Sequence, residues 1–79
     1  DTYAWVLYQL KDYKLAKKWL VKSILNGGSK SAVIVEHYGD VLYKLGEKKE
    51  AINEWQKAKE LGGASNEIDK KIKEGALYE

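Results

Sequence analysis

The sequence predicts an all-α protein built from short helices joined by tight turns. Three observations lead to this fold class. The 79 residues include no proline, and the seven glycines fall mainly at segment ends, where glycine terminates a helix at low cost. Within the segments, apolar residues recur three and four positions apart, as on the buried face of a helix. The chain also resembles itself at an offset of 35 residues.

This internal similarity extends over chemically different positions. Two unrelated amphipathic helices would match at apolar positions, but not also at alanine, tyrosine and paired glycines. We therefore interpret the chain as two copies of one unit, each with two helices. The identical pairs at the offset of 35 are Tyr3/Tyr38, Val6/Val41, Leu7/Leu42, Tyr8/Tyr43, Leu10/Leu45, Lys14/Lys49, Ala16/Ala51, Lys22/Lys57 and Gly27-Gly28/Gly62-Gly63.

The first unit, residues 1–28, is predicted to begin inside its leading helix. The second unit starts its leading helix near Ser31, and the counterpart of Ser31 would precede Asp1 by several places. Methionine is also absent, even at position 1, so we expect part of a unit and any targeting signal to lie upstream in a longer parent. Lys11 stands where a turn glycine is expected. The second helix of this unit is predicted to turn Trp19, Leu20, Ser23 and Ile24 inward.

The second unit, residues 29–63, shows the clearest pattern. A helix is predicted from Lys30 or Ser31 to about Leu45, and Gly46 ends it in a left-handed conformation. A second helix is predicted from about 48 to 61, before a closing pair of glycines. The residues expected on the inner faces of these two helices are Val35, Tyr38, Val41, Leu42, Leu45, Ala51, Ile52, Trp55 and Ala58.

The last segment, residues 64–79, predicts a terminal helix from about 66 to 77. Its apolar positions, Ile68, Ile72 and Ala76, share one side. The opposite side is expected to be a polar outer face, as on a helix that covers the end of a core. That outer face comprises Lys70, Lys71, Lys73 and Glu74.

Composition narrows the classes of function. The formal net charge is only +2, and all fourteen basic residues are lysine. Without arginine, bidentate contacts to phosphate and guanine are lost, so nucleic acid is not expected as the main partner. Cysteine is absent, which excludes a disulfide framework and a thiolate metal site. No apolar run approaches the ~20 residues that span a bilayer, so we expect no membrane insertion by this segment.

The segments YAWVLYQLKDYKLAKKWL and EHYGDVLYKLGEKKEAINEWQKAKELGG resemble tetratricopeptide repeats, especially those of bacterial arrays. The resemblance covers residues 1–63. It departs from the family pattern at Gly28 and Gly63, where proline is usual, and in the unit length of 35. The matching positions are Tyr3-Ala4 and Tyr38-Gly39, Leu7 and Leu42, Gly46, Ala16 and Ala51, Leu20 and Trp55, and Ser23 and Ala58.

The resemblance implies a right-handed α-solenoid of two helix hairpins plus a C-terminal capping helix. It also implies a non-catalytic scaffold that binds a protein or peptide on its concave face, without a cofactor. The positions that the family places on that face are Trp5, Tyr8, Gln9, Glu36, Asp40, Tyr43 and Lys44, with Asp1 and His37 beside them. Tyrosine and tryptophan suit binding because they supply contact area with few rotatable bonds.

The charge of the expected partner follows from the same positions. Some members of the family hold a C-terminal carboxylate with lysine and asparagine. Here Asp1, Trp5, Glu36 and Asp40 occupy the matching places, so the resemblance implies no such clamp. A partner that is neutral, aromatic-rich or basic is therefore expected.

Alternative interpretations remain open. The chain could be the structural C-terminal cap of a longer superhelix whose binding site lies upstream, and buried rings at Trp5, Tyr8 and Tyr43 would favour that role. It could also self-associate through apolar surface around Tyr3, Trp5 and Val6. No constellation of titratable groups suggests an enzyme or a metal site, since His37 is the single histidine.

Two sets of charged residues can be interpreted either as solvated helix surface or as functional sites. Glu36 and Asp40 lie one helical turn apart and could hold a cation, but a solvated helix face is the expected environment. A basic stripe on the second helix is likewise expected to be a solvated convex face, with contact to an acidic surface or to nucleic acid as the alternative. The stripe comprises Lys14, Lys17, Lys18 and Lys22.

Overall fold

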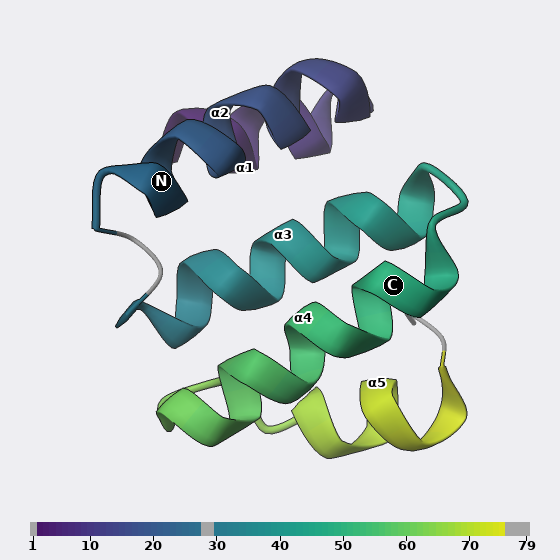
Figure 1. The fold of residues 1–79 in the computed structure, drawn as a ribbon. Helices are drawn as coiled ribbons and strands as arrows, with labels where there is room; N and C mark the ends of the chain where they lie inside the picture. Colours follow the sequence, from purple (N-terminus) through teal and green to yellow (C-terminus); the bar gives the residue numbers. More distant parts are fainter. Residues whose placement is uncertain (1, 28–29, 76–79) are drawn as a thin grey trace.

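The computed structural model describes residues 2–27 and 30–75, and these form five helices. Consecutive helices run antiparallel and pack in sequence order, α1 on α2, α2 on α3, α3 on α4 and α4 on α5 (Figure 1). The helices are α1 (Thr2–Gln9), α2 (Tyr13–Leu25), α3 (Ala32–Lys44), α4 (Lys48–Leu61) and α5 (Ile68–Glu74). The predicted all-α class is confirmed. None of the helices in the described residues has the length and apolarity to cross a membrane.

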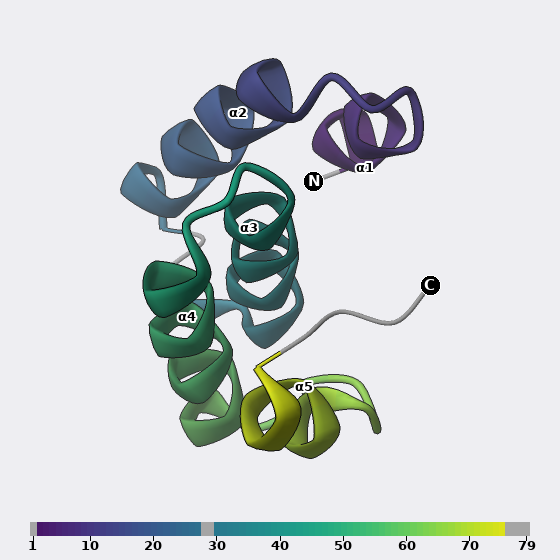
Figure 2. The ribbon, with the colours of Figure 1, turned by 90° about the vertical axis from the view of Figure 1, so that its right-hand side faces the viewer.

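Helix α3 lies in the middle of the molecule, with α1 and α2 on one side and α4 and α5 on the other (Figure 2). Each of these two sides has its own cluster of buried side chains. The first cluster contains Val41 of α3 together with residues of α1 and α2, namely Ala4, Leu7, Tyr8, Ala16 and Leu20. The second cluster lies between α3, α4 and α5 and comprises Ala32, Val35, Leu42, Ala51, Trp55, Ala58 and Ile68.

The ends of α1 and α3 have the same backbone geometry. After α1, the N–H groups of Lys11 and Asp12 donate to the carbonyls of Tyr8 and Leu7, each at 3.0 Å. After α3, the equivalent bonds run from Gly46 to Tyr43 at 3.0 Å and from Glu47 to Leu42 at 2.9 Å. This pair of bonds is a Schellman motif, which requires a left-handed residue just past the helix end. The left-handed residues are Lys11, with φ 64°, and Gly46, with φ 89°.

Lys11 is therefore a lysine in a conformation that favours glycine. We expect Lys11→Gly to raise the free energy of unfolding by about 0.5–1 kcal/mol, because relief of the left-handed strain exceeds the added entropy of the unfolded chain. The reverse change at the matching turn, Gly46→Lys, is expected to cost about 1 kcal/mol. Urea denaturation followed by circular dichroism measures both. A Lys11→Gly protein no more stable than the parent would contradict this account of the turn.

Helices α3 and α4 have the most extensive contact of the packed helix pairs. The Oγ of Ser31 accepts from the backbone N–H of Ile34 at the start of α3, which is an N-cap. In the middle of α3, Gly39 lets the ring of Trp55 on α4 come against its backbone. The predicted limits of α4 agree with the structure, and those of α3 agree within two residues.

Helix α5 is shorter than predicted. Residues 66 and 67 form a turn before it, and Gly75 ends it in a left-handed conformation. Ile68 is buried as expected, whereas Ala76 and Leu77 lie outside the described residues. The expected polar outer face needs one correction, because Lys71 is only 7% exposed. Its side chain turns inward to meet two carboxylates on α3.

Candidate functional site

The predicted concave-face residues separate into two groups. Trp5, Tyr8 and Gln9 line one recess beside the α1–α2 turn. Glu36 and Asp40 lie in the interior between α3, α4 and α5. Of the others, Tyr43 is half-buried with its ring 6.0 Å from that of Trp55, and Lys44 is half-buried at the end of α3. Asp1 lies outside the described residues.

The first group belongs to a continuous set of rings from three helices, which we call the aromatic cluster: His37, Trp5, Tyr8 and Tyr13. The Trp5 ring stacks on Tyr8 at 5.3 Å between centroids and on His37 at 4.8 Å. Tyr8 meets Tyr13 edge-on at 5.5 Å. Tyr8 is buried in this cluster, while Trp5 keeps 41% of its surface exposed. The cluster thus presents a large, rigidly stacked indole to solvent.

The recess beside the aromatic cluster has a volume of about 290 Å³. Its lining consists of Trp5, Tyr8, Gln9, Lys11 and Tyr13. Three of these side chains are aromatic, one offers an amide and one an ammonium group. Such a recess can hold an apolar or aromatic side chain and provide hydrogen bonds at its rim.

His37 supports the aromatic cluster from α3. It is half-buried, and its Nδ1 atom is buried without a hydrogen-bond partner in the described part of the chain. Burial lowers the pKa of His37 below its ordinary value of 6.5. The imidazole is therefore neutral at pH 7, and it meets Trp5 as an uncharged ring.

The second group forms a buried ionic network. The Lys71 ammonium donates to Glu36 Oε2 at 2.6 Å and to Asp40 Oδ1 at 3.0 Å. The indole N–H of Trp55 also donates to Asp40 Oδ1, at 2.9 Å. Glu36 accepts from the backbone N–H of Ser65 at 2.8 Å and from the Ser65 hydroxyl. The network therefore ties α3 to α4, to α5 and to the segment between them.

One ammonium in this network faces two carboxylates. Burial raises the pKa of Asp40 from 3.8 to about 6, although Lys71 and Trp55 oppose the rise. Burial acts in the same direction on Glu36, but hydrogen bonds from Lys71 and Ser65 outweigh it and lower the pKa of Glu36. Likewise, the carboxylates outweigh burial and raise the pKa of Lys71. At neutral pH Lys71 therefore pairs with both carboxylates, and Asp40, whose pKa is raised, is the group of this network that takes up a proton first as the pH falls.

This network corrects the prediction for Glu36 and Asp40. A solvated helix face was expected, but the two residues are 4% and 5% exposed. The reason is tertiary, since α5 docks over them and supplies Lys71. A faint signal exists, because Lys71 follows Glu36 by the 35 residues of the internal repeat. Spacing alone, however, does not show that the two side chains point at each other.

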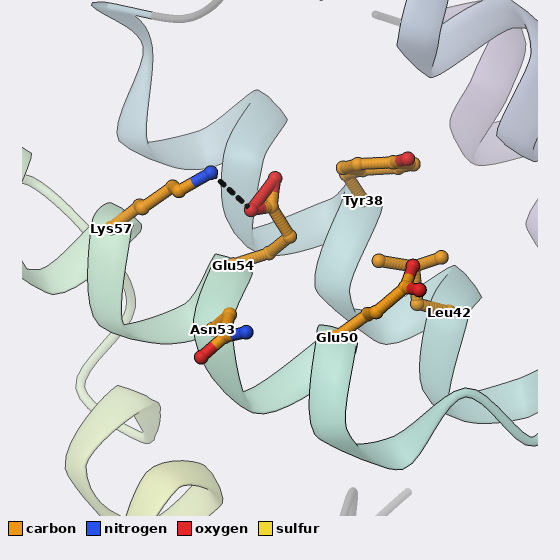
Figure 3. A pocket seen from close by; sticks show the side chains of 6 residues that line it. All are labelled: Tyr38, Leu42, Glu50, Asn53, Glu54 and Lys57. Atoms are coloured by element: carbon orange, nitrogen blue, oxygen red, sulfur yellow. Dashed lines mark ion pairs between the residues drawn. The ribbon is translucent and has the colours of Figure 1, made fainter.

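A second recess lies between α3 and α4, with a volume of about 250 Å³. Figure 3 shows its walls, Tyr38 and Leu42 from α3 and Glu50, Asn53, Glu54 and Lys57 from α4. Glu54 and Lys57 form an ion pair at 3.0 Å. Most of the side chains that line this recess are therefore polar, and this ion pair balances part of their charge. The recess beside the aromatic cluster is instead lined mainly by rings. Within residues 2–27 and 30–75, histidine, aspartate and glutamate side chains do not gather in threes that could hold a metal ion.

The chain was compared with models of protein families, with curated proteins and with solved structures. None of the three comparisons found a match. What the described residues show is a small all-helical domain of five antiparallel helices with an aromatic recess at the α1–α2 turn.

Proposed function

We propose that this chain is a non-catalytic binding module for a protein or peptide, and that the aromatic recess is its docking site. The observation that carries the proposal is the half-exposed Trp5, stacked on Tyr8 and His37 at the wall of a recess of about 290 Å³. A preformed aromatic wall binds a partner at low entropic cost because its rings are already fixed. Tryptophan and tyrosine are also the commonest residues at which binding energy concentrates.

The resemblance to tetratricopeptide repeats supports the same function. In that interpretation, α1–α2 and α3–α4 are two units of a solenoid, and α5 stands where the next leading helix would begin. Two pairs of equivalent positions have the same burial, since Ala16 and Ala51 are both fully buried, as are Leu20 and Trp55. The identical pair Val6 and Val41 differs, with Val6 45% exposed and Val41 1% exposed. The Schellman turns at Lys11 and Gly46 also correspond at the offset of 35.

The buried ionic network limits where a partner can dock. Glu36 and Asp40 already bind Lys71, so in this arrangement they offer no surface to a ligand. We therefore propose docking on Trp5, Tyr8 and Gln9 of α1. Helix α1 lies at the end of the molecule away from α5 (Figure 2).

A purely structural role is the second candidate, and the same network favours it. Helix α5 covers the second cluster of buried side chains, with Ile68 and Lys71 turned inward. A helix with these contacts closes the end of a helical array. In this role the aromatic cluster would only brace α1 against α2 and α3.

Selection from a random peptide library distinguishes the two candidates. The whole chain would be immobilised as wild type, Trp5→Ala and Gln9→Ala, with Gln56→Ala on the exposed face of α4 as the matched control. We expect peptides that bind the wild type and the control equally. Trp5→Ala should weaken them at least tenfold, which is about 1.4 kcal/mol. Circular dichroism would verify that each variant keeps its helix content.

The opposite result is equally clear. If no peptide is enriched, or if the folded Trp5→Ala protein enriches the same peptides with the same affinity, the recess is not a docking site. The structural cap would then be the better description of the chain.

A further inference from the structure

The charge of the described residues is unevenly distributed along the chain. Residues 2–27 contain five lysines and one aspartate, a net charge of +4. Residues 30–75 contain nine lysines and nine carboxylates, a net charge of zero. The modest overall charge therefore conceals a basic half formed by α1, α2 and their turn. That half contains the aromatic recess.

The positive charge reaches the recess itself. Among the described residues, Lys11 is the charged residue of the lining, and none of the lining residues in residues 2–27 and 30–75 carries a carboxylate. Helix α1 has no charged residue, and α2 has four lysines and no acid. Two of those lysines are engaged, Lys17 with Glu47 at 3.1 Å and Lys22 over the Trp19 ring at 5.1 Å.

The remaining lysines are available to a partner. Lys11, Lys14 and Lys18 are exposed, and within residues 2–27 and 30–75 none of them has a carboxylate partner. Lys14 and Lys18 lie one helical turn apart on α2, so they share a face. Lys14 directly follows Tyr13 of the recess lining. An aromatic recess and a row of unpaired ammonium groups thus adjoin each other.

We propose that the partner segment is acidic: an aromatic side chain enters the recess, and flanking carboxylates pair with Lys11, Lys14 and Lys18. This inference rests on the proposed function and specifies its ligand. The earlier reason to expect a neutral or basic partner was the set Asp1, Trp5, Glu36 and Asp40. Of its carboxylates, Glu36 and Asp40 are buried and paired with Lys71, and Asp1 lies outside the described residues. The aromatic part of that expectation is kept. Complementary charge would raise the association rate and fix the direction of the bound segment.

A peptide fits these contacts better than a nucleic acid does. Single strands are held by aromatic stacking along a basic groove, which requires several accessible ring faces in a row. Here Tyr8 is buried, and Trp5 is stacked on both Tyr8 and His37. The chain also has no arginine for bidentate phosphate contacts. Nucleic acid is therefore one of the outcomes that the experiment must separate.

The test uses the whole chain and four fluorescent probes, with binding measured by anisotropy at low and high salt. The first probe is a short amidated peptide with a central tyrosine flanked by glutamates. The second replaces the glutamates by lysines, the third replaces the tyrosine by alanine, and the fourth is an oligouridine. We expect the first probe to bind about tenfold tighter than the second and third, with an affinity that falls as salt rises.

Matched variants locate the contact. Lys14→Glu is expected to weaken the acidic probe about tenfold. Lys49→Glu makes the same change at the equivalent exposed position of α4, 35 residues later, and is expected to alter binding less than about twofold. Trp5→Ala should weaken the acidic probe as strongly as Lys14→Glu does.

Each contrary outcome has a distinct meaning. If the lysine-flanked probe binds as well as the acidic one and still depends on Trp5, the docking site stands and the acidic partner is wrong. If the oligouridine binds tighter than both, the basic half is a nucleic-acid surface and the inference fails. If no probe depends on Trp5, this inference fails, and the library selection decides separately whether the recess binds any peptide.

Discussion

Gly39→Ala is expected to lower the free energy of unfolding by about 2 kcal/mol, although alanine is the better helix former by about 1 kcal/mol. A Cβ atom at residue 39 would lie 2.5 Å from Cδ1 and 2.6 Å from Nε1 of Trp55, and 3.1 Å from the backbone oxygen of Ala51. Neither neighbour can yield easily, because Trp55 is fully buried and bonded to Asp40. Overpacking therefore exceeds the gain in helix propensity. Urea denaturation followed by circular dichroism measures the difference.

The first helix pair suggests the compensating change. At the offset of 35, Gly39 and Trp55 correspond to Ala4 and Leu20, which are both buried. Each helix pair thus combines a small residue with a larger one. The pair with the smaller glycine has the larger tryptophan, and the pair with alanine has the smaller leucine. We expect Trp55→Leu to relieve the clash of Gly39→Ala, so the double variant should lose less than the sum of the single losses. Strict additivity would show that the contact between these two residues does not cause the loss.

Trp55→Ala should have the largest effect of any single truncation in the molecule. Trp55 is the largest fully buried side chain in the described residues. Removing such a side chain costs about 3–5 kcal/mol. A chain of this length has a total stability of about 4–12 kcal/mol, so the variant should lose much of its cooperative unfolding transition. Trp19→Ala, at a half-buried ring, is the control and should cost less than half as much.

Trp55→Phe separates the hydrogen bond from the packing. Phenylalanine keeps a six-membered aromatic ring, so it loses less packing than alanine does, and it cannot donate to Asp40 Oδ1, which Trp55 reaches at 2.9 Å. A hydrogen bond to a charged group contributes about 1.5–3 kcal/mol, and without it Asp40 Oδ1 keeps only the bond from Lys71. The variant should therefore fall between the wild type and Trp55→Ala in urea. Equal stability of Trp55→Phe and the wild type would show that this bond contributes little.

The helices could be predicted from the sequence because their signals are local. Ser31 at the start of α3 and Gly46 after its end are recognisable from residue type, and both act as expected. The left-handed conformation of Lys11 is not indicated by its residue type, and only its alignment with Gly46 at the offset of 35 points to it. Helix α5 was predicted too long at its start, since residues 66 and 67 form a turn.

The candidate site was only partly predictable, because its two groups depend on different kinds of contact. Trp5, Tyr8 and Gln9 lie within one short helix, so their spacing already places them near one another. The burial of Glu36 and Asp40 depends on where α5 docks, and that is set by contacts across about half the chain. A lysine among polar neighbours on a terminal helix gives no local sign that it will turn inward.

The three tryptophans lie at three depths. Trp5 is 41% exposed, Trp19 is half-buried with the Lys22 ammonium over its ring, and Trp55 has no exposed surface. A water-soluble quencher therefore reaches the first, reaches the second in part and does not reach the third. The intrinsic fluorescence of the chain thus contains separate optical signals from the recess and from the interior. Quenching of the wild-type chain therefore distinguishes the accessible Trp5 from the inaccessible Trp55, so occupancy of the recess and opening of the core can both be followed without an attached dye.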